Sequence, residues 1–175
     1  IALAHMLTKA CAEALQRVPS LNTVLVGDDI LYFDEVNIGV AVALDEGLIV
    51  PVVRNVESKD VFQISRDTDD LAKKAKDGKL LPDEVVGATF TISVLGSVDG
   101  ITPVLSHGQS ALLGVGRTSQ KPVVKSGEIV VREMVTLSLT VDHQTVDGAV
   151  AASFMRRLQQ LIERPAGLVK KGDAT

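Results

Sequence analysis

The sequence predicts an α/β (α+β) domain in which helices flank a mixed, largely antiparallel sheet. Two observations predict this class: some segments place apolar residues three and four positions apart, and shorter segments alternate apolar with polar residues. Gly, Pro and Asp residues separate these segments and mark turns. With 175 residues, 46% of them hydrophobic and 23% charged, the chain has the size and composition of one globular domain with a substantial core.

Helical spacing and end signals predict helices at residues 3–18, 61–77 and 148–164. Ser58 or Asp60 is expected to cap the second helix, and Gly78 to end it. Asp147 is expected to cap the third helix, because its side chain can accept a hydrogen bond from an N–H group of the first turn.

Alternation and turn signals predict short extended segments at residues 21–26, 30–33, 88–94, 111–115, 123–124, 129–132 and 134–142. Residues 37–44 and 48–53 are almost continuously apolar. They predict a long hairpin that is covered on both faces or packed against another subunit. Pro51 cannot donate to a ladder of hydrogen bonds, which predicts an edge or a bulge in its strand.

Composition and charge exclude several classes of partner. Aromatic residues make up only 3% of the chain and Trp is absent, which argues against base-stacking platforms. A net charge of −4 and an isoelectric point near 5.4 argue against a nucleic-acid partner. Cys11 is the single cysteine, which excludes an intrachain disulfide and a multi-cysteine metal site and favours a reducing compartment. No apolar run reaches the ~18 residues of a membrane span.

The stretch from Met134 to Gly148 predicts a strand that delivers a histidine to a defined place. Its alternation places four aliphatic side chains on one face: Val135, Leu137, Leu139 and Val141. If fully buried, each would contribute ~1.5–3 kcal/mol and together they would hold the register of the strand. The next position on that face is His143.

The residues alone leave three chemical interpretations of His143 open beside a structural one. A metal site is weakly supported because no soft ligand accompanies the histidine. A serine hydrolase is weakly supported because the sequence contains no G-x-S-x-G nucleophile elbow. A general base is the best of the three, since imidazole exchanges protons near neutral pH. The structural alternative is a core histidine with satisfied ring nitrogens. Asp147 could orient the ring or only cap the helix, and His107 is a rival candidate.

Four segments together resemble one family. DHQTVDG at residues 142–148 resembles the D-H-R-x-x-D/N-G signature of the acyltransferase component of 2-oxo acid dehydrogenase complexes, a family related to chloramphenicol acetyltransferase. Further segments resemble the same family in order: NIGVAV at residues 37–42 with GLIVPV at 47–52, TFTIS at 89–93 with Leu95 and Gly96, and ALLGVG at 111–116. The resemblance extends from about Leu7 to Val169.

The resemblance implies a chloramphenicol acetyltransferase-like fold and a specific reaction. Members of this family are dihydrolipoamide acyltransferases. They move an acyl group from a dihydrolipoamide thioester to the thiol of their second substrate, coenzyme A, and they use no metal. His143 matches the base that removes the thiol proton. Ser93 matches the hydroxyl that donates to the oxyanion, and Asp147 matches the Asp or Asn that accompanies the histidine.

The resemblance also implies an assembly. The family forms homotrimers with active sites between subunits, and the trimers build a cubic or dodecahedral core.

Residues 1–169 are expected to form the catalytic domain without the N-terminal part usual in the family, and residues 170–175 are expected to form a polar tail. The lipoyl group would be carried on a separate domain, since this chain has neither a lipoyl nor a peripheral-subunit-binding domain. The expected partners are the lipoyl domain, the decarboxylase and the dihydrolipoamide dehydrogenase. No nucleic acid or membrane partner is expected, and the expected location is the cytoplasm or the mitochondrial matrix.

Two departures and two alternatives accompany the resemblance. Gln144 stands where the family has Arg, so a charged hydrogen bond is lost or supplied differently. The loop of residues 97–109 lacks the usual N-P-P-type run. A non-catalytic scaffold paralogue would normally have lost the histidine or the serine, and a free-standing acetyltransferase of the antibiotic-modifying type would need no lipoyl partner. Residues 132–139 favour a pyruvate or branched-chain substrate type.

Overall fold

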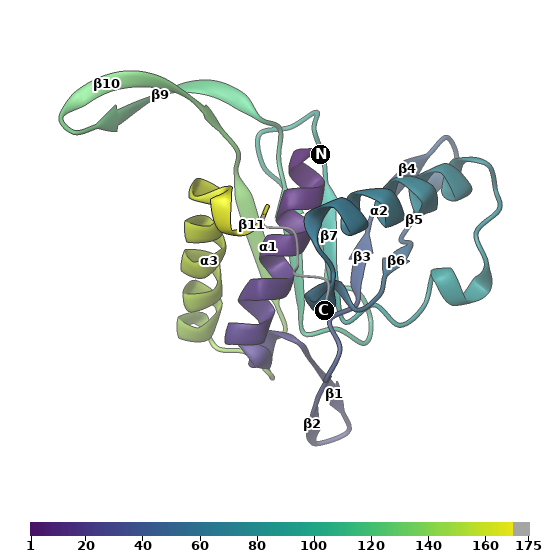
Figure 1. Cartoon of the computed structure of the whole chain (residues 1–175). Coiled ribbons are helices and arrows are strands. Elements are labelled where there is room, and N and C mark those ends of the chain that lie inside the picture. Colours follow the sequence, from purple (N-terminus) through teal and green to yellow (C-terminus); the bar gives the residue numbers. More distant parts are fainter. Residues whose placement is uncertain (170–175) are drawn as a thin grey trace, which may run out of the picture.

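A computed structural model describes residues 1–169, and the predicted tail of residues 170–175 lies outside this range. A mixed sheet with the strand order β11-β8-β7-β3-β6 forms the centre of the fold (Figure 1). Its strands are β3 (Ile38–Val40), β6 (Val52–Val53), β7 (Phe90–Val94), β8 (Ala111–Val115) and β11 (Leu137–Val141). The pairs β3–β7 and β7–β8 are parallel, and the outer pairs β3–β6 and β8–β11 are antiparallel.

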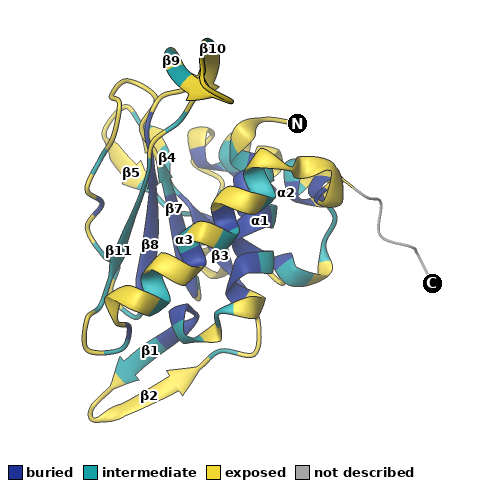
Figure 2. Ribbon diagram, turned by 90° about the vertical axis from the view of Figure 1, so that its left-hand side faces the viewer, coloured by how far each residue is buried: buried dark blue, intermediate teal, exposed yellow. Residues whose placement is uncertain are grey.

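The predicted helices are present: α1 (Leu3–Arg17), α2 (Val61–Lys76) and α3 (Gly148–Glu163). All three lie on one side of the sheet (Figure 2). Asp60, rather than Ser58, caps α2: its Oδ1 accepts from the Gln63 backbone N–H at 2.7 Å, and the Gln63 side chain accepts from the Asp60 N–H at 2.8 Å. Gly78 ends this helix region with a positive φ of 65°. No helix within residues 1–169 is long and apolar enough to cross a membrane.

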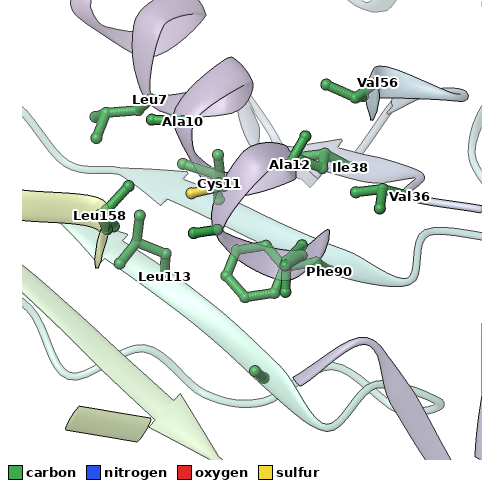
Figure 3. Close-up of a cluster of buried hydrophobic side chains, with 14 of the residues drawn as sticks. Leu7, Ala10, Cys11, Ala12, Val36, Ile38, Val56, Phe90, Leu113 and Leu158 are labelled. Atoms are coloured by element: carbon green, nitrogen blue, oxygen red, sulfur yellow. The ribbon is translucent and has the colours of Figure 1, made fainter. Parts of the chain in front are cut away.

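The core lies between α1 and the sheet. Figure 3 shows Leu7 and Cys11 of α1 beside Phe90 of β7 and Leu158 of α3. Phe90 also packs against Phe154, with ring centroids 5.7 Å apart. Cys11 is completely buried, and burial raises the pKa of its thiol, so it is a core residue and not a nucleophile.

The predicted long hairpin of residues 37–53 is divided into two ladders. Its base is the pair β3–β6, and its tip is the pair β4 (Val42–Leu44) and β5 (Gly47–Ile49). The division falls at Pro51, and β6 is an edge strand of the sheet, as the missing N–H of Pro51 predicts. Only the base is covered: β3 is fully buried, whereas Leu48 at the tip is 64% exposed.

Two further hairpins project from the body (Figure 1). The strands β1 (Thr23–Val26) and β2 (Asp29–Tyr32) form the first. The strands β9 (Ser119–Lys125) and β10 (Glu128–Met134) form the second, and this ribbon is much longer than the sequence predicts. The predicted strand of residues 134–142 is therefore wrong at its start, because Met134 pairs with β9 whereas β11 begins at Leu137 and pairs with β8.

Short 3₁₀ helices connect the remaining elements at Pro19–Leu21, Val56–Ser58, Pro82–Glu84 and Pro165–Gly167. The loop between β7 and β8 covers the sheet face opposite the helices. A Cβ at Gly114 of β8 would lie 2.7 Å from Ile101 and 3.0 Å from Pro103. The Thr140 hydroxyl of β11 donates to the Pro103 carbonyl at 2.7 Å. These contacts hold the loop on that face of the sheet.

Candidate active site

His143 lies in a tight turn directly after β11. The preceding Asp142 fastens this turn to the sheet, because its N–H donates to the Ser110 carbonyl at 2.9 Å, just before β8 begins. The Asp142 carbonyl accepts from the N–H groups of Thr145 at 3.0 Å and Val146 at 2.9 Å. It also accepts from the Thr145 hydroxyl at 3.1 Å. Val146 is buried, so the turn is anchored at both of its ends.

The side chain of Asp142 organises the inside of this turn. Its Oδ1 accepts from the backbone N–H of Gln144 at 3.0 Å and from the Gln144 amide nitrogen at 3.5 Å. An aspartate that accepts from the N–H two residues later is a common turn device. Gln144 thus supplies neutral hydrogen bonds to Asp142 where arginine would supply charged ones. Sequence reasoning missed this role, although an Asp at the start of a turn could have indicated it.

The imidazole of His143 is exposed and has no hydrogen-bond partner within residues 1–169. The core-histidine interpretation is therefore wrong for a single chain. The strand ends at Val141, so the alternation that places Leu139 and Val141 toward the helices does not continue to His143. The turn holds the backbone of His143 firmly while the ring stays open to a substrate or to another subunit.

Asp147 caps α3. Its Oδ1 accepts from the backbone N–H of Val150 at 2.9 Å, and its φ and ψ of −87° and 167° are those of an N-cap residue. Within the described part of the chain no hydrogen bond joins Asp147 to His143. Asp147 therefore fixes the start of the helix that follows the histidine turn.

Ser93 lies on β7, half-buried. It pairs with Gly114 of β8, and both residues belong to the loop-covered face of the sheet. Thr91, two residues earlier on the same face, donates its hydroxyl to Oε1 of Gln109 at 2.9 Å. The sheet and the loop thus position Ser93 through residues that are distant in the sequence.

The register separates Ser93 from His143 within one chain. Ser93 pairs with Gly114, and Gly114 pairs with Ser138, so Ser93 and Ser138 lie ~10 Å apart across two strand spacings. His143 follows Ser138 toward the opposite end of the sheet, because β11 is antiparallel to β8 and β7 is parallel to it. Adding ~3.3 Å per residue along the strand gives a separation on the order of 15–20 Å. One substrate carbonyl cannot contact both side chains of the same chain.

His107, the rival candidate, lines a cleft of about 540 Å³ next to the histidine turn. The β1 strand forms one wall of this cleft, and Ser106, Gln109 and Asp142 contribute polar groups to it. The structure therefore brings His107 near Asp142, at the same end of the sheet as His143, but on an irregular loop.

Comparisons with known proteins agree on one family. The sequence model of the 2-oxoacid dehydrogenases acyltransferase (catalytic domain) matches residues 1–170. The dihydrolipoyllysine-residue acetyltransferase component of the pyruvate dehydrogenase complex of Staphylococcus aureus is 45% identical over 168 residues, which cover 94% of this chain and 39% of that protein. The corresponding Staphylococcus epidermidis protein is 43% identical with the same coverage. The chain thus spans about two fifths of the length of these curated relatives.

Solved structures agree with this assignment. A probable dihydrolipoamide acetyltransferase from Listeria monocytogenes superposes with a TM-score of 0.91 at 33% identity, covering 100% of this chain and 74% of that one. The Azotobacter vinelandii dihydrolipoamide acetyltransferase, studied for the catalytic roles of a serine, a histidine and an asparagine, gives 0.91 at 37%, covering 97% and 72%. The same values hold for a cubic core of the pyruvate dehydrogenase multienzyme complex.

Chloramphenicol acetyltransferase superposes with a TM-score of 0.59 at 14% identity, covering 92% of this chain and 78% of that one. At this low identity the likeness concerns the fold alone, and it confirms the fold expected from the sequence. The match of the family model over nearly the whole chain, together with relatives at 45% identity, identifies the family. The chain belongs to the family of 2-oxoacid dehydrogenase acyltransferase catalytic domains.

Proposed function

We propose that this chain is the catalytic domain of a dihydrolipoamide acyltransferase, formed by residues 1–169, which transfers an acyl group from a dihydrolipoamide thioester to coenzyme A. The observation that carries the proposal is the turn that presents His143. Asp142, Ser110 and Val146 fix its backbone, while the imidazole has no hydrogen-bond partner within residues 1–169 and is exposed. A general base needs this combination of a fixed position and a free ring nitrogen.

The reaction begins when His143 accepts the proton of the coenzyme A thiol, because a thiol attacks poorly until it is deprotonated. The thiolate sulfur then forms a bond to the thioester carbonyl carbon, and the carbonyl oxygen becomes an oxyanion. When this intermediate collapses, the bond to the dihydrolipoamide sulfur breaks. That sulfur takes the proton back from the imidazolium, so the histidine is regenerated. No metal takes part in this scheme.

Ser93 is proposed to donate its hydroxyl to the oxyanion, where a preorganised donor acts most strongly. The study of the Azotobacter vinelandii enzyme supports this assignment, because it concerns a serine that precedes a histidine and an asparagine four positions after that histidine. Here Ser93 precedes His143, and Asp147 stands four positions after it. Asp147 caps α3, so we propose that it acts by fixing the helix that supports the histidine turn.

The complete site is proposed to lie between two copies of the chain in a homotrimer. The estimated separation of Ser93 and His143 supports this, since the serine of one copy and the histidine of the next must meet. A cyclic head-to-tail arrangement satisfies every site at once. The likeness to a cubic core of a pyruvate dehydrogenase multienzyme complex further supports assembly of the trimers into a larger core, cubic or dodecahedral.

The relatives favour acetyl as the acyl group, because they are components of pyruvate dehydrogenase complexes. The proposed partners are a lipoyl domain that carries the thioester, the decarboxylase and the dihydrolipoamide dehydrogenase. The proposed location is the cytoplasm, since the relatives are bacterial. A free-standing antibiotic acetyltransferase is less well supported, because chloramphenicol acetyltransferase is only 14% identical.

The test compares acetyl-, isobutyryl- and succinyl-dihydrolipoamide as donors, with formation of the coenzyme A thioester as the measured quantity. Acetyl transfer with the highest kcat/KM is the expected result. Preference for isobutyryl would move the chain to the branched-chain type and leave the mechanism intact. The absence of transfer from all three donors by a folded trimer would contradict the proposed activity and favour a scaffold.

A further inference from the structure

Ile101, in the loop between β7 and β8, lies directly over Gly114, the residue that pairs with Ser93. A Cβ at Gly114 would lie 2.7 Å from Cγ1 of Ile101 and 3.1 Å from its Cδ1. The isoleucine therefore fills the space that a side chain at residue 114 would otherwise occupy. Because paired strands lie ~4.8 Å apart, Cγ1 of Ile101 is within roughly 8 Å of the Cβ of Ser93.

The neighbours of Ser93 across the sheet are small. Gly114 lies beside it on β8. On the other side, the register of β3 and β7 places Ala41, whose N–H donates to the Ile92 carbonyl at 3.0 Å. Glycine and alanine add little bulk next to the Ser93 hydroxyl. The large apolar side chain on the Gly114 side is that of Ile101.

The loop is anchored on both sides of Ile101. Before it, the Val98 carbonyl accepts from the Arg117 N–H at 2.7 Å. After it, the Pro103 carbonyl accepts from the Thr140 hydroxyl at 2.7 Å. Ile101 itself is half-buried between these anchors. Its side chain is therefore held against the sheet and does not yield freely to a bulkier group.

Under the proposed function, on which this step rests, the donor brings its acyl group to this position. The Ser93 hydroxyl donates to the thioester carbonyl oxygen, and such a bond is ~2.8 Å long. The carbon next to the carbonyl carbon then lies about 4–5 Å from the hydroxyl oxygen, given ordinary bond lengths. In an acetyl group this carbon is the methyl group, whereas in an isobutyryl group it carries two further methyl groups.

We infer that Ile101 is a specificity-determining residue: the acyl chain packs on its side chain, whose bulk restricts the donor to a short unbranched acyl group such as acetyl. The acyl chain is the apolar end of the donor, and Ile101 provides apolar surface next to the proposed oxyanion donor Ser93. An acetyl methyl group needs no change in the loop. The methyl groups of isobutyryl would have to displace Ile101, which the anchored loop opposes.

The test shortens the Ile101 side chain. Ile101→Ala removes every carbon beyond Cβ, and acetyl- and isobutyryl-dihydrolipoamide are then compared as donors to coenzyme A. We expect the kcat/KM for isobutyryl, divided by that for acetyl, to rise at least about tenfold over the parent, since one methylene in an apolar site changes kcat/KM by about 10- to 200-fold. Ile101→Val removes only the terminal methyl group and should raise the ratio by a smaller factor.

The ratio of the two donors separates specificity from folding. Both donors meet the same active sites, so a lower fraction of folded protein cancels from the ratio. Circular dichroism and sedimentation establish that each variant keeps the parent fold and mass. If Ile101→Ala does not fold, the more conservative Ile101→Val decides by the same ratio.

Val104→Ala is the matched control. It shortens a branched aliphatic side chain in the same loop, but Val104 is 88% exposed, so the donor ratio should stay at the parent value. An unchanged ratio in both Ile101 variants, with acetyl still transferred by the parent, would overturn the role of Ile101 and leave the proposed function standing. A parent that already prefers isobutyryl would overturn that role as well. A folded parent that transfers neither acyl group would instead contradict the proposed function, and this inference with it.

Discussion

The histidine turn and the strand of Ser93 hold their side chains in two different ways. Residues 142–147 make the turn largely from their own hydrogen bonds, with Ser110 as one distant partner. Ser93 instead depends on Gly114 and on the loop that packs at Ile101, residues brought together only by the sheet. The first unit is local and nearly self-contained, and the second is a product of the whole fold. Each is half of a site, and the register keeps the halves of one chain apart.

The largest expected effect on turnover comes from removing the imidazole of His143. His143→Ala should lower the turnover of acetyl transfer by ~10²–10⁴, the usual contribution of a positioned base. The imidazole is exposed and makes no hydrogen bond within residues 1–169, so the fold and the melting temperature should not change. His107→Ala is the control and should keep near-parent turnover. Equal losses in both variants would show that His107 shares the role of the base.

Removing the Ser93 hydroxyl should have a smaller effect on turnover. Ser93→Ala is expected to lower turnover by ~10²–10³, the range for one oxyanion donor, and less than His143→Ala. Ser138→Ala is a matched control, because Ser138 lies in the same row of the sheet two strands away. Steady-state rates at saturating coenzyme A measure both. A loss in Ser138→Ala as large as that in Ser93→Ala would assign the effect to the sheet rather than to the hydroxyl.

A third substitution tests whether the turn is as self-contained as its hydrogen bonds indicate. Asp142→Ala removes the acceptor of the Gln144 N–H and should lower kcat by about tenfold through misplacement of His143, with KM unchanged. Asp142→Asn keeps an oxygen in that place and should restore most of kcat. If Asn and Ala are equally impaired, the negative charge of Asp142 matters rather than the geometry it imposes.

The smallest effect is expected at the helix that follows the turn. Asp147→Ala removes the cap on Val150 and should lower the free energy of unfolding by ~1 kcal/mol. Asp147→Asn can accept the same hydrogen bond and should keep both stability and turnover. Urea denaturation measures the difference. A large loss of turnover in Asp147→Asn, with stability retained, would show that the carboxylate acts on the histidine directly.

The same contrast explains which features could be predicted from the sequence. The limits of α1, α2 and α3 follow from local spacing and from caps such as Asp60 and Asp147, and the structure confirms them. The alternation of apolar and polar residues predicted the wrong strand limits where the choice of pairing partner determines them. Residues 134–142 look like one strand, yet Met134 joins the ribbon and β11 begins at Leu137, because β9 and β8 are their separate partners.

The candidate site divides in a similar manner. The sequence motif indicates His143 and its turn, and the local pattern also predicts the capping role of Asp147, but only the structure shows that the His143 ring is exposed. Ser93 was assigned only through the resemblance, since a serine in an alternating strand carries no local signal. The distance between the two follows from strand order and direction, which no local pattern specifies.

Mixed trimers test the central claim, a site shared between copies, most directly. His143→Ala and Ser93→Ala chains, each with its own tag, are produced together, and trimers that carry both tags are isolated. Their acetyl-transfer activity is compared with that of trimers of each variant alone and of the parent chain. If each site takes its serine from one copy and its histidine from the next, every trimer that contains both variants has about one third of its sites intact, because only one of its three interfaces joins an intact serine to an intact histidine. The expected activity of these trimers is therefore about one third of the parent value, far above either variant. Activity equal to the average of the two inactive variants would place both residues in the site of a single chain and contradict the account.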